Sequence, residues 1–208
     1  MFRKYIALFG LFAFFLTGAF SPQTASAQLG FAVGGNFNDL SDIDSDPPTT
    51  FDNATGFHVG VFYDLGVGPV ALRPGLFYMD AGDFDANGDG FEAQSFDLQF
   101  IEVPVDVRFN VLTAPIVRPY VMAGPVLRFA QTSDDDFKDS LNEFSYAANV
   151  GFGLEIGPPV GGFTLYPEIR YAFGVSSITD DNEFLGAGFT ADEDQQFNAF
   201  MLRLGVSF

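Results

Sequence analysis

The connections between the apolar segments of this chain are of two kinds, and the order in which they occur strongly constrains the fold. Short, apolar connections lie at residues 65–69, 110–117 and 157–161. Long, acidic connections occupy roughly residues 37–53, 80–95, 131–144 and 176–195. The two kinds take strict turns along the sequence, beginning and ending with a long one. This order is typical of a meander of antiparallel strands whose two ends face different surroundings.

The segments between the connections alternate between apolar and polar residues, as strands with two different faces do. Each segment is close to or longer than the roughly 9–11 residues that a tilted strand needs to cross a bilayer. Short turns at one end and long loops at the other are typical of transmembrane β-barrels. We therefore predict an all-β fold, an eight-stranded antiparallel up-and-down transmembrane β-barrel with strands at residues 29–37, 56–64, 70–79, 96–109, 119–130, 145–156, 163–173 and 197–208.

The charged residues within these strands share one face. A charge that faced the middle of a bilayer would cost about 2–4 kcal/mol, whereas an arginine and a carboxylate in a narrow lumen can pair. The balance between the two signs favours a filled lumen over an ion-selective channel. The predicted lumen network consists of Arg73, Arg108, Arg128, Arg170, Arg203, Asp64, Glu102, Asp106, Glu155 and Glu168.

A soluble barrel or sandwich with the two faces exchanged has the same period, so alternation alone does not decide which face meets water. Small residues such as Gly60, Gly124 and Gly151 share the face of the arginines. A narrow barrel interior needs small side chains among the large ones, while a surface in water does not. The sequence therefore favours a barrel with its apolar face toward lipid.

Two features do not fit regular strands. The apolar phase changes near Phe100, which predicts a β-bulge there or a strand that continues above the membrane. Prolines also fall inside predicted strands, where each removes a donor from the ladder. They are Pro74, Pro104, Pro125 and Pro167.

The N-terminal residues resemble a targeting segment. Arg3 and Lys4 precede an apolar stretch at residues 5–20, and the small residues Ala25 and Ala27 form a cleavage motif. The alternative is a membrane anchor, but the stretch is short and a polar break follows it. We expect a cleaved signal peptide at residues 1–27 and one outer-membrane barrel domain at residues 28–208.

The chain carries a net charge of −18 and has no cysteine. A chain of such negative charge repels the phosphate backbone, so nucleic acid is a poor partner. Most of the acidic residues lie in the long connections, which form either a solvated, repulsive surface or a cation-dependent surface that binds an envelope glycolipid or protein partner. We expect no cofactor, although divalent cations could bind loosely at these acidic loops.

Residues 85–90 resemble the beginning of a calcium loop, but an EF-hand would need a glutamate where Phe96 stands. The alternative is an ordinary turn rich in Asp, Asn and Gly. If a metal site exists here, its candidate ligands are Asp83, Asp85, Asn87, Asp89 and Glu92.

No enzyme signature is present. His58 is the only histidine, and it lies on the polar face among glycines, where a hydrogen bond in the lumen is the simplest interpretation. A Ser-His-Asp hydrolase would need a serine close to His58, which the sequence does not indicate. The chain is therefore predicted not to be an enzyme.

Several strands resemble motifs of a known family. The motifs lie at residues 100–105 (FIEVPV), 118–125 (RPYVMAGP), 151–156 (GFGLEI) and 166–171 (YPEIRY). Together they resemble the outer-membrane β-barrel domain family, which includes porin-family and PorT-like small barrels of Gram-negative bacteria. The resemblance implies an aromatic C-terminal signal for the barrel-assembly machinery, formed by Phe200, Leu202, Leu204, Val206 and Phe208.

These observations favour a non-enzymatic protein of a Gram-negative outer membrane, with a structural, adhesive or partner-binding role. Its partners would be outer-membrane lipid and, during biogenesis, the assembly machinery. Both termini would be periplasmic and the long loops extracellular. A passive pore for small solutes and a lipid-modifying enzyme with His58 as base remain as alternatives.

Overall fold

The computed structural model describes residues 26–41, 49–88, 94–112, 114–131, 144–157, 162–178 and 196–208. The predicted signal peptide lies almost wholly outside them. The described residues contain no helix that is long and apolar enough to cross a membrane. Their strands are β1 (Ser26–Leu40), β2 (Thr49–Phe51), β3 (Ala54–Val67), β4 (Val70–Gly88), β5 (Gln94–Asn110), β6 (Val117–Gln131), β7 (Ser145–Ile156), β8 (Thr164–Gly174) and β9 (Phe197–Ser207).

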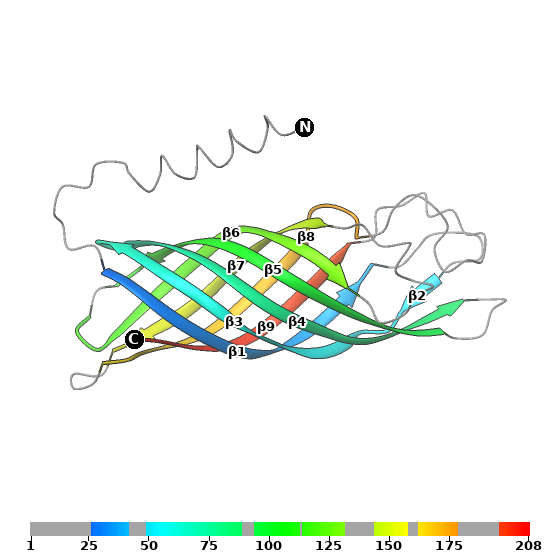
Figure 1. Cartoon of the computed structure of the whole chain (residues 1–208), viewed down its shortest axis with the longest axis horizontal. Helices are drawn as coiled ribbons and strands as arrows, with labels where there is room; N and C mark the ends of the chain where they lie inside the picture. The colour runs from blue at the N-terminus through cyan, green and yellow to red at the C-terminus, as the bar shows by residue number, and fades with distance from the viewer. Residues whose placement is uncertain are drawn as a thin grey trace, which may run out of the picture.

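Eight of these strands close into a barrel. Each of β1, β3, β4, β5, β6, β7 and β8 pairs antiparallel with the next long strand, and β9 pairs back with β1. The three-residue strand β2 adds to the edge of β4 beyond the barrel wall. The strands run obliquely along the long axis, and the C-terminus lies at the end that carries the short turns (Figure 1). The predicted eight-stranded up-and-down topology is confirmed.

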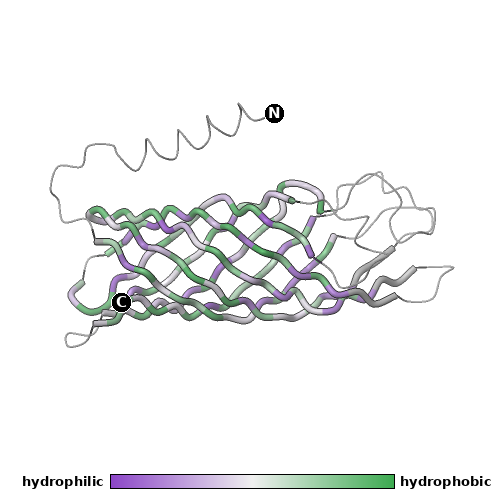
Figure 2. Tube along the Cα trace, in the orientation of Figure 1, coloured by the Kyte–Doolittle hydropathy of each residue, from purple (hydrophilic) through white to green (hydrophobic). Residues whose placement is uncertain are grey.

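Residues alternate between the inside and the outside of this barrel, and the apolar set faces outward. In β9, Leu202 and Leu204 are 46% and 52% exposed, whereas the intervening Arg203 is 7% exposed. Hydrophilic and hydrophobic segments accordingly alternate along the strands (Figure 2). The interpretation with inverted faces is wrong for this chain, because the arginines that it would place in water lie inside: Arg73, Arg108, Arg128, Arg170 and Arg203.

The hairpin between β4 and β5 is longer than the sequence indicated. Most of the connection expected at residues 80–95 is strand, since β4 runs to Gly88 and β5 begins at Gln94. The β-bulge predicted near Phe100 is also wrong: Leu98, Phe100 and Glu102 all face inward in one phase. The register shift lies in β4 instead, between Asp80 and Asp83, where Gly82 has a φ of 84°.

The four prolines coincide with interruptions of the ladders. Two successive residue pairs are missing in each of the β3–β4, β4–β5, β5–β6 and β7–β8 pairings, and one proline falls in each gap. In β3–β4, for example, pairing stops at Phe62/Gly75 and resumes at Leu65/Leu72, on either side of Pro74. The prolines are accommodated because the ladder is open where their missing donor would have been needed.

Two apolar clusters fill parts of the interior. The first lies at the end away from the short turns, and we call it the loop-end plug. The second lies deeper in the lumen and includes Phe62, Phe77, Tyr120 and Tyr166. The loop-end plug comprises Leu40, Ala54, Met79, Ala81, Phe84, Leu98, Phe100, Ala172, Ile178, Phe197, Ala199 and Met201.

Candidate functional site: the barrel lumen

Arg73, which β4 directs into the lumen, lies at the centre of the charged network. Its Nη2 donates to Asp64 Oδ2 at 2.6 Å, and its Nη1 pairs with Glu168 on the far side of the barrel. Tyr120 donates its hydroxyl proton to the same glutamate at 2.6 Å. The guanidinium carbon also lies 4.5 Å from the ring centre of Tyr166. Arg73 thus joins strands that are far apart around the barrel.

A second group surrounds Arg170 of β8. Its Nη2 pairs with Asp106 and also donates to Asn149 Oδ1 at 2.8 Å. The amide of Asn149 in turn donates to Asp106 Oδ1 at 2.8 Å. Arg170 Nη1 lies 3.5 Å from Glu168 Oε2, which connects this group to Arg73.

Arg128 connects the network to the loop-end plug. Its Nε donates to Glu102 Oε1 at 2.8 Å, and its Nη1 donates to the backbone carbonyl of Phe197 at 2.9 Å. The guanidinium carbon lies 4.9 Å from the ring centre of Phe197. The charged network and the loop-end plug are therefore in direct contact at Arg128.

Arg203 differs from the other inward arginines. Among the described residues, no carboxylate oxygen lies within 4.0 Å of it. Its Nε donates to His58 Nε2 at 3.0 Å, and its guanidinium carbon lies 4.0 Å from the ring centre of Phe77. Because Nε2 accepts, the proton of the neutral imidazole belongs on Nδ1, which lies 3.4 Å from Asn36 Oδ1.

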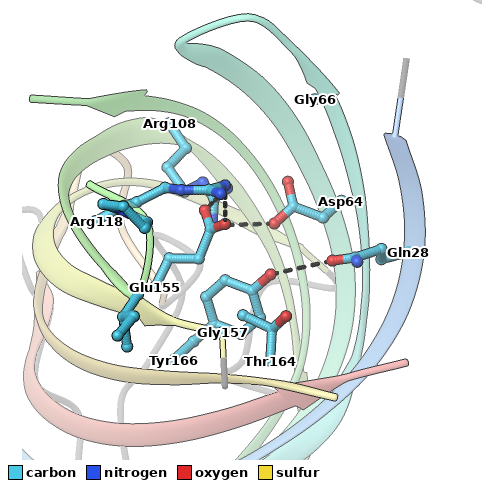
Figure 3. A pocket seen from close by; sticks show the side chains of 11 residues that line it. Gln28, Asp64, Gly66, Arg108, Arg118, Glu155, Gly157, Thr164 and Tyr166 are labelled. Carbon is cyan, nitrogen blue, oxygen red and sulfur yellow. Dashed lines mark hydrogen bonds and ion pairs between the residues drawn. The ribbon is translucent and has the colours of Figure 1, made fainter. Parts of the chain in front are cut away.

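A pocket of about 250 Å³ lies at the short-turn end of the lumen, and we call it the turn-end pocket. Glu155 bridges two arginines there, with Oε1 2.8 Å from Arg118 Nη1 and Oε2 2.8 Å from Arg108 Nη2. Arg108 Nη1 also lies 3.1 Å from Asp64 Oδ2. Figure 3 shows Arg118 and Glu155 on one side of the pocket and Asp64 and Gln28 on the other.

All ten residues of the predicted lumen network face inward, and nine of them form ion pairs with one another; Arg203 is the exception. Sequence reasoning left Arg118 out of the network because it adjoins a short turn. It also missed Tyr120 and Asn149, which carry no charge. Both residues lie on the inward face of their strands, β6 and β7, and this position could have identified them from the sequence.

The other candidate residues have different surroundings. The side chains of Asp83 and Asp85 are exposed, whereas the side chain of Asn87 and all of Asp89 and Glu92 lie outside the described residues. Within the described part of the chain, no cluster of three or more potential ligands could hold a metal ion. The proposed C-terminal signal residues Phe200, Leu202, Leu204, Val206 and Phe208 lie on the outward face of β9 and just after it, Val206 being the least exposed.

A closed antiparallel barrel with an apolar exterior and a charged, internally paired interior satisfies its backbone without water, as hydrocarbon requires. The fold and the lumen therefore define a transmembrane β-barrel protein. The model of the outer membrane protein beta-barrel domain family matches residues 10–208. The chain belongs to this family, which places it in the outer membrane.

Several solved structures are similar to this chain. Neisserial surface protein A (NspA) is 16% identical, with 88% of this chain and 99% of that chain covered and a TM-score of 0.49. Ail, the attachment invasion locus protein of Yersinia pestis, is 15% identical over 88% and 99%, with a TM-score of 0.44. The N-terminal β-barrel domain of Pseudomonas aeruginosa OprF is 14% identical over 88% and 100%, with a TM-score of 0.37. Among curated proteins, none matches this sequence.

Proposed function

We propose that this protein is a non-conducting, non-enzymatic outer-membrane barrel that acts as a rigid support for its long loops. One observation carries the proposal: ion pairs and rings fill the lumen from the middle of the barrel to the loop end. Arg73, Arg128 and Arg170 are each at most 3% exposed, so water has little access to them. A conducting porin needs a continuous aqueous path, which this filling opposes.

In this proposal the short turns and both ends of the mature chain face the periplasm, and the long loops face the exterior. The acidity of those loops supports a surface role, either through repulsion or through loosely bound divalent cations. A glycolipid or an envelope protein would be the partner of such a surface. During biogenesis, the assembly machinery would recognise the outward-facing residues at the end of β9.

Single-channel recording in planar lipid bilayers tests the closed lumen. The purified, refolded barrel is expected to give no steady openings at any applied voltage. Heat-modifiable migration on a denaturing gel, measured on the same sample, controls for correct folding. Regular, reproducible openings of the folded protein would refute the proposal and support the passive pore instead.

The enzymatic alternative depends on His58, which is buried and contacts Arg203 and Asn36. A chain with His58→Ala, expressed in cells that lack the native protein, is expected to leave the lipid composition unchanged. The control is the same strain with the unaltered chain. A difference in lipid modification between the two strains would show that the protein is an enzyme.

A further inference from the structure

The turn-end pocket is a blind chamber. It is lined at the short-turn end of the barrel by residues of β1, β3, β6, β7 and β8, among others. The Arg73 group and the loop-end plug fill the lumen beyond it. At about 250 Å³, it is smaller than the pockets of roughly 300–1,000 Å³ that hold drug-sized ligands. A ligand of this chamber must therefore be small and must enter from the short-turn end.

Two buried side chains that line the pocket each have a polar atom that makes no hydrogen bond to the part of the chain that the structure describes. Among the described residues, neither Asp64 Oδ1 nor Arg108 Nε has a hydrogen-bond partner. Asp64 is 4% exposed and Arg108 is 6% exposed. Both atoms are enclosed, so we expect each to gain a partner when a guest or an ordered water enters the pocket and the side chains adjust to it.

The charges of the pocket wall balance, with Arg108 and Arg118 against Asp64 and Glu155. A guest with a net charge would be attracted by the two residues of opposite sign and repelled by the two of like sign. A guest that carries both signs is attracted by the arginines and by the carboxylates. In Figure 3, the guanidinium group of Arg118 and the carboxylate of Asp64 lie on opposite sides of the chamber.

We propose that the turn-end pocket binds a small zwitterion of the size of a free amino acid. Its ammonium group lies toward Asp64, and its carboxylate lies toward Arg118. The side chain of Arg118 is 44% exposed, so it can meet the guest at the mouth. This site goes beyond the support role and does not depend on whether the lumen conducts.

Saturation-transfer difference NMR on the refolded barrel in detergent micelles tests the site, with glycine, alanine and serine as zwitterionic probes. Acetate and methylammonium each carry one half of the recognised charges, and D-glucose offers hydroxyl groups without charge. The zwitterions are expected to give saturable signals, and the other three probes weaker ones or none. Equal signals from acetate, from methylammonium or from D-glucose would overturn the proposal, as would the absence of signal from every zwitterion.

Two variants locate the binding. Arg118→Gln, at an exposed position, is expected to fold and to weaken zwitterion binding about tenfold. Asp64→Asn tests the ammonium partner and is assayed if gel migration shows that it folds. Asp83→Asn, an exposed aspartate at the opposite end, is the matched control and is expected to bind as the unaltered chain does. Unchanged binding in Arg118→Gln would show that the signal arises elsewhere and would refute the assignment.

Discussion

The same substitution at two inward arginines is expected to have very different effects on stability. Arg73→Met leaves Asp64 and Glu168 buried without their shared cation. Breaking a buried ion pair from one side costs about 3–5 kcal/mol, because the remaining charges lose their partner without gaining water. Asp64 and Glu168 keep the longer contacts with Arg108 at 3.1 Å and Arg170 at 3.5 Å, which compensate them in part. Arg203→Met removes a buried cation that has no carboxylate partner among the described residues, so it leaves no carboxylate behind.

The cost at Arg203 consists of smaller contributions. His58 Nε2 loses its donor, which costs about 1–3 kcal/mol, and the contact with the Phe77 ring is worth up to about 2 kcal/mol. The substitution also has a stabilising effect, because it removes the desolvation penalty of an unpaired guanidinium, which is several kcal/mol. The two nearly offset each other, so Arg203→Met is expected to be at least about 2 kcal/mol less destabilising than Arg73→Met.

Urea-dependent folding into detergent or lipid vesicles measures the difference. The chain contains no tryptophan, so the folded fraction is read from heat-modifiable gel migration and from far-UV circular dichroism. The midpoints and slopes give the free energy of unfolding of each variant. If the two free energies agree within about 0.5 kcal/mol, the argument that pairing decides the cost is wrong.

Three further outcomes are expected. A Cβ at inward Gly34 would lie 2.1 Å from the Leu202 carbonyl oxygen, whereas at Gly35 the nearest atom is 3.9 Å away, so Gly34→Ala should lower the free energy of unfolding by about 1–3 kcal/mol and Gly35→Ala should not. Phe197→Ala in the loop-end plug should cost about 3–5 kcal/mol, yet bilayer recordings should still show no openings because the ion pairs remain. Deletion of Phe208 should reduce the amount of barrel in outer-membrane fractions while leaving refolding in detergent unchanged. If the variant and the unaltered chain reach the membrane in equal amounts, Phe208 has no role in assembly.

The sequence predicts which side chains enter the lumen, because strand phase divides the residues into two faces and the small residues beside the arginines identify the inner one. It does not predict their partners. Opposite charges that face each other across neighbouring strands do pair in two cases, Glu102 with Arg128 in β5–β6 and Arg118 with Glu155 in β6–β7. Glu168 and Arg203 do not follow this rule. They are opposite in β8–β9, yet Glu168 reaches across the lumen to Arg73. Contacts across a barrel depend on its diameter and stagger, which no local pattern encodes.

The charged network and the in-strand prolines are connected through the backbone. The β5–β6 ladder lacks the pairs Val105/Pro125 and Asp106/Gly124. The carbonyl of Gly124, which faces Asn149 in the β6–β7 register, accepts from the inward Asn149 Nδ2 at 3.3 Å, so a lumen side chain contacts the backbone beside this gap.

Asn149→Ala therefore removes a donor from a backbone carbonyl as well as from Asp106. It is expected to lower the free energy of unfolding by about 2 kcal/mol or more in the urea assay. The exposed variant Asp83→Asn, which contacts neither group, serves as the control. A cost of less than about 0.5 kcal/mol for Asn149→Ala would mean that the lumen side chains do not support the interrupted ladders.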